Sequence, residues 1–388
     1  MKLHEYQAKE VFSKAGIPIP RGRIALSEAE AVAAAEEIGF PCVLKAQVLR
    51  GGRGKAGLIR LVHDRDQARD AAAALFGSPV DVRRILVEEA VDIERELYLS
   101  VTADPAAASA LILACAEGGV EIEDLARTAP GKILRQSVPM AEGLLPFRAR
   151  SVAYSLGLEG ETARKFAALT QNLYGIFSAQ DAELAEINPL FVTKSGALVA
   201  GDGKLSIDDN SMFRHPEWEP GRDYFESDIE FEAYKEGIPY LQFDGDISLM
   251  CAGAGLTTTV YDLIADAGGT VANYLEFGGP NYRKGLKAME LCVKNDPKVI
   301  LIVTFGTIAR ADVMAEGIVQ AIEALKPKCP IVVCIRGTGE DAAAATLKAA
   351  GLEPLMDTEV AIARAVALAR EGCLSAQGGA GRGTGGRA

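Results

Sequence analysis

The spacing of hydrophobic positions predicts two parts of the chain with different organisation. In the first part, apolar residues at helical spacing predict helices over Glu5–Ala15, Ser27–Ile38 and Glu161–Phe177. Period-two alternation predicts strands over Pro41–Leu49, Leu58–Val62, Arg84–Glu88, Glu96–Val101 and Leu111–Cys115. Two more predicted strands, Leu184–Thr193 and Ala197–Asp202, are separated by a linker that suits a three-residue hairpin loop, Lys194-Ser195-Gly196.

The second part alternates apolar strands with helices, which is typical of a doubly wound parallel sheet. The strands are predicted at Ile247–Cys251, Thr270–Tyr274, Val299–Phe305 and Ile331–Ile335. The helices are predicted at Leu256–Ala267, Lys284–Lys294, Asp312–Ala324, Glu340–Ala350 and Glu359–Ala369. We expect one domain at residues 1–235, which ends in a polar, acidic segment, a second at 236–373, and a disordered glycine-rich tail at 374–388.

Composition narrows the class of protein. The 388 residues carry 41 Lys and Arg against 53 Asp and Glu, and this net charge of −12 argues against a nucleic-acid partner. A hydrophobic share of 49% excludes a largely disordered chain. The charged start resembles no secretory signal, and no apolar stretch reaches the ~18 residues of a membrane span. The seven cysteines form no CxxC pair, so we expect buried thiols in a cytoplasmic protein without membrane attachment.

A basic, glycine-rich loop joins two of the predicted strands. Lys45 precedes the loop Gly51–Gly57, which contains Gly52, Arg53 and Gly54. Glycines let backbone N–H groups approach phosphate oxygens, and Lys and Arg supply the counter-charge. A Walker-type P-loop is excluded, because the loop does not run into a helix and lacks the GxxxxGK[ST] pattern. The loop suits a nucleoside triphosphate clamped under a hairpin, and the alternative is a solvated basic turn.

Three oxygen-bearing side chains are predicted to share one face of the later hairpin. If Thr193 pairs with Ala197, Asn188 lies directly opposite Asp202. Glu186 lies two residues from Asn188 and therefore projects from the same face. One or two carboxylates with amide and phosphate oxygens are the ligands that Mg²⁺ prefers, so the pattern predicts a magnesium site. The alternative is a solvated polar hairpin face.

Glycine-containing turns also follow the strands of the second part. After Gly253-Ala254-Gly255, Thr258 stands where a dinucleotide fingerprint has its third glycine, so a tight turn is favoured over an NAD site. Phe305–Asp312 lies at the carboxyl end of a buried strand and begins a helix, where free N–H groups suit a phosphoryl or carboxylate group. The alternative is ordinary use of glycine in such loops. The three histidines, His4, His63 and His215, lack an evident catalytic partner.

The assembled motifs resemble the β subunit of the succinyl-CoA synthetase family, the nucleotide-using succinate–CoA ligases. The resemblance covers the chain to about residue 370 and includes Leu3–Lys9, Gly51–Gly57, Glu117–Glu123, Glu186–Leu190 and Asp202–Lys204. It implies an N-terminal ATP-grasp domain followed by a flavodoxin-like doubly wound parallel sheet. It also implies a partner α subunit that carries the phosphohistidine and most CoA contacts, which agrees with the lack of a candidate histidine here.

The resemblance implies a role for each matching residue. The nucleotide phosphates would be bound by Lys45, Gly52, Arg53 and Gly54. The nucleoside would be lined by Glu88, Val91 and Glu96, and Mg²⁺ held by Asn188 and Asp202. Glu186 would face the phosphohistidine when it visits the nucleotide, so the expected catalytic residues are Glu186 and Arg53. Pro20 resembles the forms that use ATP rather than GTP.

The second part departs from the family pattern where the acid binds. Ala252 stands in place of the family's asparagine, and Thr307-Ile308-Ala309 in place of Gly-Ile-Val. The expected acid-binding residues are therefore Ala252, Thr307, Ile308 and Ala309. The expected reaction converts ATP, a carboxylic acid and CoA to acyl-CoA, ADP and phosphate. Succinate or a related dicarboxylate would be the acid, with a place in the tricarboxylic acid cycle, while malate, citrate or a bulkier acid stays open.

Two other functions stay open at this point. A self-contained ATP-grasp ligase would need no histidine relay and would be active as this chain alone. A non-catalytic, nucleotide-binding regulatory subunit is motivated by the changed acid-binding residues.

Overall fold

The computed structural model describes residues 1–49 and 52–378 and divides into two compact units, Met1–Pro220 and Gly221–Ala388. The division lies earlier than the expected boundary at residue 235, because helix α7 (Asp228–Lys235) belongs to the second unit. Its Ala233 is fully buried in the core of that unit, and Ile229 packs against the same core. The polar segment around the division forms three short 3-10 helices, η2 (Asp209–Arg214), η3 (Pro216–Trp218) and η4 (Arg222–Tyr224).

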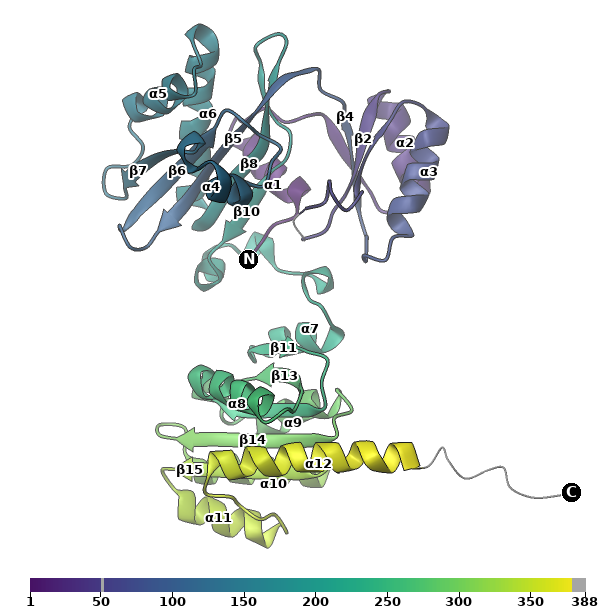
Figure 1. Cartoon of the computed structure of the whole chain (residues 1–388), viewed down its shortest axis with the longest axis vertical. Helices are drawn as coiled ribbons and strands as arrows, with labels where there is room; N and C mark the ends of the chain where they lie inside the picture. The colour runs from purple at the N-terminus through teal and green to yellow at the C-terminus, as the bar shows by residue number, and fades with distance from the viewer. Residues whose placement is uncertain (50–51, 379–388) are drawn as a thin grey trace, which may run out of the picture. The chain divides into compact units, whose positions relative to one another are not determined.

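The first unit contains two antiparallel sheets, of which the smaller has the order β1-β4-β2-β3. Its strands are β1 (Gly22–Ala25), β4 (Ile85–Glu89), β2 (Cys42–Ala46) and β3 (Ile59–Val62). Helices α2 (Glu28–Ile38) and α3 (Arg65–Phe76) pack beside it around alanine, leucine and valine side chains (Figure 1). Ser27 and Asp64 cap the two helices by accepting hydrogen bonds from backbone N–H groups of the first turn. The glycine-rich loop joins β2 to the antiparallel β3, as predicted.

The larger sheet has the order β10-β8-β5-β6-β7, with β9 paired to β8. Its strands are β5 (Ile93–Asp104), β6 (Ser109–Cys115), β7 (Leu134–Pro139), β8 (Ala182–Thr193), β9 (Leu198–Ala200) and β10 (Lys204–Ile207). Helices α1 (Glu5–Lys14), α5 (Pro146–Ser155) and α6 (Gly160–Ala179) contribute apolar side chains to the core of this sheet. The short α4 (Ile122–Thr128) and η1 (Pro130–Lys132) bury no residue. Two sheets with flanking helices agree with the expected ATP-grasp fold.

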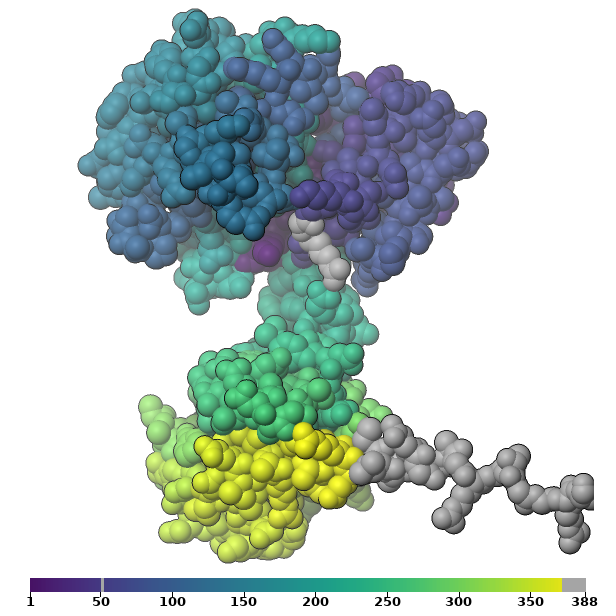
Figure 2. Space-filling model, in the orientation of Figure 1, coloured from purple at the N-terminus to yellow at the C-terminus, as the bar shows by residue number. Residues whose placement is uncertain are grey.

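The second unit is a five-stranded sheet of order β11-β13-β12-β14-β15, parallel except for β11 at its edge. The strands are β11 (Tyr240–Gln242), β12 (Ile247–Ala252), β13 (Val271–Leu275), β14 (Val299–Gly306) and β15 (Ile331–Gly337). One face is covered by α8 (Ala254–Asp266) and α12 (Thr358–Gly378), which lie side by side in Figure 2. The other is covered by α9 (Gly285–Val293), α10 (Ala311–Leu325) and α11 (Glu340–Ala349), with η5 (Gly279–Asn281) leading into α9. Helices on both faces confirm the predicted flavodoxin-like, doubly wound architecture.

Some elements differ from the prediction. The sequence predicted neither α3 nor α5, and α5 buries only Ala149, Val152 and Ala153, which give a weak apolar period. Helix α12 runs to Gly378, beyond the expected start of the tail at 374, and the rest of that tail lies outside the described residues. Cysteines 42, 115, 251, 292 and 334 are buried free thiols, as predicted, and Cys329 is half-buried. Among the described helices, none is long and apolar enough to cross a membrane.

Candidate active site

The β8–β9–β10 hairpin has the register that the sequence predicted. The backbone N–H of Thr193 donates to the carbonyl of Ala197 over 2.9 Å, which closes the three-residue loop. Further along, the partners are Phe191 with Val199, Pro189 with Gly201, and Glu186 with Lys204. Asn188 and Asp202 fall between these pairs, and Asp202 occupies the break between β9 and β10. The continuous register therefore places both residues opposite one another.

A cavity of about 950 Å³ lies in the first unit between the glycine-rich loop, the hairpin and the segment that leads into α4. Pockets that hold small molecules and cofactors have volumes of about 300–1,000 Å³, so the cavity is large enough for a nucleotide. Six of the predicted site residues line it: Gly52, Arg53, Gly54, Glu186, Asn188 and Asp202. The structure thus brings the phosphate-binding loop and the candidate metal ligands together.

Four predicted nucleotide residues do not line this cavity. Lys45 and Glu88 are buried directly behind its wall, where they pair with each other over 2.8 Å. Glu96 lies beside the wall, since its carbonyl accepts a hydrogen bond of 3.0 Å from the N–H of Gly118. Val91 is half-buried between β4 and β5. The nucleoside contacts implied by the family resemblance therefore stay predictions.

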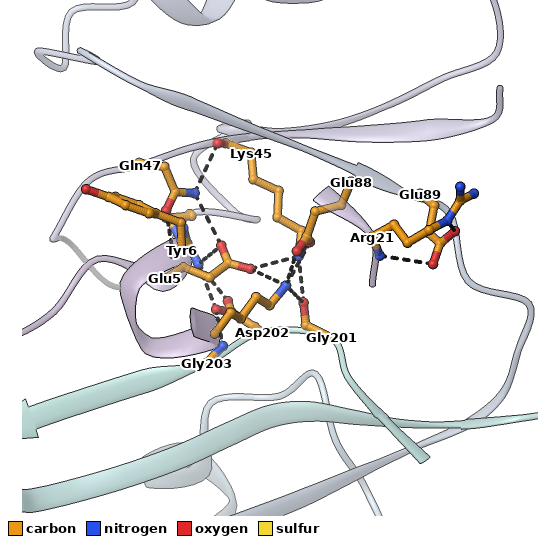
Figure 3. A network of polar contacts seen from close by, with 12 residues as sticks. Glu5, Tyr6, Arg21, Lys45, Gln47, Glu88, Glu89, Gly201, Asp202 and Gly203 are labelled. Atoms are coloured by element: carbon orange, nitrogen blue, oxygen red, sulfur yellow. Dashed lines mark hydrogen bonds and ion pairs between the residues drawn. The ribbon is translucent and has the colours of Figure 1, made fainter. Parts of the chain in front are cut away.

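Three cations and three carboxylates at and behind the cavity wall form what we call the ion cluster: Lys9, Lys45, Arg53, Glu5, Glu88 and Asp202. Glu5, Arg53 and Asp202 line the cavity. Figure 3 shows the carboxylates of Glu5, Glu88 and Asp202 around Lys45. Glu5 lies at its centre and accepts from Lys9 at 2.9 Å, from Lys45 at 2.9 Å and from Arg53 at 2.7 Å. Burial by itself would raise the pKa of Glu5, but the three neighbouring cations hold this pKa well below its ordinary value. Glu5 is therefore an ionised carboxylate inside the protein.

The two lysines of the ion cluster are anchored differently from Arg53. Lys9 follows Glu5 by four residues on α1 and donates to both carboxylate oxygens of Glu88, over 2.6 and 2.7 Å. Lys9 and Lys45 also share the carbonyl of Gly201, over 2.9 and 2.6 Å. Burial would lower the pKa of Lys45, but the carboxylates of Glu5, Glu88 and Asp202 keep this pKa above its ordinary value. The ammonium group of Lys45 is therefore charged, and the contacts hold both lysine side chains in place.

Sequence analysis singled out neither Glu5 nor Lys9 as a functional residue. Their i, i+4 spacing on a helix was visible, and both belong to a motif of the family resemblance. Such spacing also occurs on exposed helix faces, as with Glu10 and Lys14 on the same helix. Burial of the first pair depends on β2, β4 and the hairpin, which lie far away in the sequence.

Arg53 connects the glycine-rich loop to the hairpin. Its guanidinium donates to both carboxylate oxygens of Asp202, over 2.9 and 2.8 Å, and to the carbonyl of Ala46 over 3.2 Å. Burial would lower the pKa of Arg53, but Glu5 and Asp202 raise it above the ordinary value. Both bonds to Asp202 start from one nitrogen, Nη2, and we call this bifurcated, charge-assisted contact the Arg53 fork.

Glu186 is buried at the floor of the cavity. Its carboxylate accepts a hydrogen bond of 3.0 Å from the hydroxyl of Tyr98 and pairs with the ammonium of Lys204 over 3.0 Å. Burial and the nearby charge of Glu186 raise the pKa of Tyr98 far above its ordinary value, so the hydroxyl keeps its proton. The contacts fix the orientation of a buried carboxylate that faces the space where a ligand would bind.

The donor set at the hairpin fits a magnesium ion that arrives with phosphates. Asn188 accepts from the N–H of Gly119 over 2.9 Å and donates to the carbonyl of Val120 over 3.0 Å, which fixes its amide. Asp202 and Asn188 line one cavity but form a set of only two protein ligands. Among the described residues, no group of three or more His, Cys, Asp or Glu side chains could hold a metal ion. Mg²⁺ commonly binds through one or two carboxylates plus substrate phosphates and water, so two ligands suffice.

In the second unit, the predicted acid-binding residues gather at the carboxyl edge of the sheet. Ala252 ends β12, and Thr307–Ala309 connect β14 to α10. These neighbouring parallel strands send their helices to opposite faces, so a topological switch point lies between them. Ligands of open α/β sheets bind at such points. Thr307 is exposed, and Ile308 has 94% of its side-chain surface exposed.

An ATP-grasp unit with a cavity beside a glycine-rich loop, followed by a flavodoxin-like unit, defines a nucleotide-dependent CoA ligase. Residues 2–192 match the ATP-grasp domain family, and residues 250–371 match the CoA-ligase family. The β subunit of the ADP-forming succinate–CoA ligase of Geobacter sulfurreducens is 43% identical, across 87% of this chain and 91% of its own. The chain therefore belongs to the β subunits of ADP-forming acid–CoA ligases, which confirms the predicted family.

Other relatives are more similar. The ADP-forming sulfoacetate-CoA ligase subunit SauC of Bilophila wadsworthia is 59% identical, across 95% of this chain and 99% of its own. The corresponding subunit SqwK of an Acholeplasma species is 54% identical, across 95% and 92%. The structure of ATP citrate lyase from Methanothrix soehngenii, with citrate and coenzyme A, has a TM-score of 0.75 at 21% identity and covers 95% of this chain and 99% of that one. This last likeness shows a shared fold.

Proposed function

We propose that this chain is the nucleotide-binding β subunit of an ADP-forming sulfoacetate–CoA ligase. The reaction would convert ATP, sulfoacetate and CoA to sulfoacetyl-CoA, ADP and phosphate. The observation that carries the proposal is the likeness to two sulfoacetate-CoA ligase subunits over 95% of the chain, at 59% and 54% identity. The succinate enzymes are less similar, at 43% identity or below. We therefore propose sulfoacetate in place of the expected succinate, and no role in the tricarboxylic acid cycle.

The cavity supports ATP as the phosphoryl donor. Gly52 and Gly54 would let backbone N–H groups approach the phosphates. Arg53 would contact the phosphates from the cavity wall, and Lys45 would add positive charge from behind that wall. Asp202 and Asn188 would hold Mg²⁺, which when bound neutralises charge on the β- and γ-phosphates. Phosphoryl transfer depends mainly on positioning and charge neutralisation, and these are what the residues around the cavity offer.

The relatives are named as subunits, which implies a partner chain. We propose that the partner supplies the histidine that accepts the phosphoryl group and most contacts to CoA. Glu186 would accept a hydrogen bond from one ring nitrogen of that histidine, which leaves the other nitrogen free to attack the γ-phosphorus. The hydroxyl of Tyr98 and the ammonium of Lys204 keep Glu186 oriented for this contact. Cytoplasmic location stays a prediction.

The second unit would bind the acid. Sulfoacetate has two carbons where succinate has four, and in place of one planar carboxylate with two oxygens it carries a tetrahedral sulfonate with three. Ala252 leaves more room at the end of β12 than the asparagine of the succinate pattern. Thr307 adds a hydroxyl donor just before α10, whose N-terminal N–H groups attract anions. The larger space and the additional hydrogen-bond donor suit a sulfonate, which is larger than a carboxylate.

The test is to co-express the chain with an α subunit of the same ligase family and to measure ADP formation with Mg²⁺, ATP and CoA. The acids compared are sulfoacetate, succinate, malate and citrate. We expect a kcat/KM at least tenfold higher for sulfoacetate than for succinate. An enzyme that prefers succinate contradicts the proposed substrate. Binding of ATP without turnover of any acid would favour the regulatory alternative, and turnover without the partner would favour a self-contained ligase.

A further inference from the structure

The carboxylate of Asp202, which is proposed to bind the metal, already forms an ion pair with the guanidinium of Arg53. Asp202 receives both hydrogen bonds of the Arg53 fork, and one of its oxygens also accepts from the N–H of Gly203 over 2.7 Å. The Arg53 side chain is only 10% exposed and that of Asp202 only 25% exposed. Water therefore screens this ion pair weakly. A metal ion at the same oxygens has to replace the guanidinium.

The ion cluster is electrically balanced without any ligand. Three carboxylates face three cations, and every carboxylate contacts at least one cation. An ATP triphosphate brings about four negative charges and its metal ion two positive ones. The incoming ligands can therefore exchange partners with the cluster: the phosphates accept a cation from it, and the metal takes the place of that cation on Asp202.

Only one of the three cations lies where it can make this exchange. Arg53 lines the cavity and comes from the glycine-rich loop, whereas Lys9 and Lys45 lie behind the wall. If Arg53 leaves, Glu5 keeps both lysines as partners over 2.9 Å each. Glu88 likewise keeps Lys9 and Lys45. Asp202 is then the carboxylate that loses its forked partner, and it is the one that would gain the metal.

We propose that Arg53 is the resident counter-ion of Asp202 in the ligand-free protein, and that metal and triphosphate enter together by moving its guanidinium from Asp202 to the phosphates. Glu5, which contacts the same guanidinium nitrogen, Nη2, at 2.7 Å, is the positioning residue that keeps it at this place. The inference rests on the proposed metal role of Asp202. It adds that this chain discriminates against metal without nucleotide.

The consequence is thermodynamic coupling between the two ligands. A divalent cation alone must break the Arg53–Asp202 pair without offering Arg53 a new partner. Triphosphate alone must draw Arg53 away and leave Asp202 charged and poorly solvated. Each ligand removes the cost that the other would meet, so each should raise the affinity for the other by the same factor. Loss of the guanidinium should remove most of this coupling.

The test measures binding of Mn²⁺, as a paramagnetic stand-in for Mg²⁺, to the full chain by electron paramagnetic resonance without nucleotide. We expect Arg53→Gln to bind Mn²⁺ at least tenfold more tightly than the wild type. Arg53→Lys keeps the charge but loses the fork and should lie between them. Lys55→Gln is the matched control, because it removes one positive charge from the same loop at a side chain that is 76% exposed. We expect this control to change Mn²⁺ affinity less than twofold.

Two outcomes overturn the inference: unchanged Mn²⁺ affinity in Arg53→Gln, or an equal gain in Arg53→Gln and Lys55→Gln, which would indicate a general charge effect. A separate titration distinguishes failure of the proposed metal role. In the presence of ATP, Asp202→Asn should weaken Mn²⁺ binding at least tenfold. If it does not, Asp202 is no metal ligand and the proposed function is at fault. If it does while Arg53→Gln changes nothing, only the counter-ion role fails.

Discussion

The two units hold their candidate functional residues in opposite ways. In the first unit, the side chains of Arg53 and Glu186 are only 10% and 7% exposed and make several charged contacts to residues of the same chain. In the second unit, the loop before α10 is open, with Thr307 and Ile308 exposed. The proposed nucleotide site is therefore held by contacts within this chain, whereas the proposed acid-binding edge presents side chains outward.

This difference suggests how relatives with one chemistry differ in their acids. Replacing one residue of the ion cluster leaves a buried charge without its counter-ion. This lowers the stability of the fold unless the residue that carries the remaining charge is replaced as well. Changing an exposed loop residue costs little stability. Substitutions can therefore collect at the acid-binding edge while ATP chemistry stays the same. The relatives agree with this division, since those named for sulfoacetate and those named for succinate are all ADP-forming.

The largest expected effect comes from Asp202→Ala. Without this carboxylate the proposed metal loses its only charged protein ligand, and Arg53 loses its forked partner. We expect kcat of the complex with its partner to fall at least a hundredfold, which is the scale for losing a main electrostatic contact in a transfer reaction. Asp92→Ala, at an exposed carboxylate that pairs with Lys194, is the control and should leave kcat unchanged. A loss below threefold in Asp202→Ala would contradict the site.

The next effect is on stability, and α1 provides a matched pair. Glu5→Gln removes the central carboxylate of the ion cluster and should lower the free energy of unfolding by about 3 kcal/mol, as for other broken buried pairs. Glu10→Gln changes the same residue type on the same helix, where Glu10 forms an exposed i, i+4 pair with Lys14. It should cost less than about 0.5 kcal/mol. Urea unfolding followed by Trp218 fluorescence measures both, because this single tryptophan packs on the core of the first unit. Equal effects of the two substitutions would contradict the expected difference between the buried Glu5 and the exposed Glu10.

The pH dependence of that stability should follow Glu5. Because its pKa is lower in the folded protein than its ordinary value of 4.5, the folded state favours the ionised carboxylate. The resulting stabilisation is fully present above pH 4.5 and is lost as the pH falls through the lower, folded pKa. The stability difference between wild type and Glu5→Gln should therefore shrink below pH 4.5. Urea midpoints at pH 7, 5, 4 and 3 would show this, and a difference that grows in acid would contradict it.

Much of the candidate nucleotide site could be predicted from the sequence, because short stretches of the chain contain the patterns that define it. The three-residue loop at Gly196 fixed the hairpin register and hence the positions of Asn188 and Asp202. The same reasoning recognised the glycine-rich loop as a link between antiparallel strands. Regular alternation of strands and helices likewise predicted the second unit. Each of these patterns lies within a short stretch of the sequence, so neighbouring residues determine the local structure.

The ion cluster could not be read in the same way. Glu5, Lys45 and Asp202 come from α1, β2 and the hairpin, and the cluster exists only when all three meet. Lys45 was expected at the phosphates, but in this structure Glu5 and Glu88 hold it behind the wall. The boundary near residue 235 was misplaced for a similar reason, since the docking of α7 onto the second unit depends on Ala233 meeting a distant core. Local pattern carries no information on such partners.

At the acid-binding edge we expect a smaller effect, confined to substrate choice. Thr307→Gly removes the hydroxyl proposed to contact the sulfonate and restores the glycine of the succinate pattern. The ratio of kcat/KM for sulfoacetate over succinate should fall about tenfold, the size expected for one hydrogen bond to a charged group. The KM for ATP should not change, since Thr307 belongs to the second unit. A proportional loss with both acids would mean that Thr307 does not select between them.

The smallest effect should come from Tyr98→Phe, which tests whether the buried contacts of the first unit matter individually. The hydroxyl of Tyr98 donates to Glu186 over 3.0 Å and lies 2.9 Å from Ser100, so its loss leaves the carboxylate charged and still paired with Lys204. We expect kcat to fall about threefold to tenfold, the scale for one neutral donor to a charged acceptor, with the KM for ATP unchanged. An unchanged kcat in Tyr98→Phe would contradict a contribution of this hydrogen bond to the orientation of Glu186.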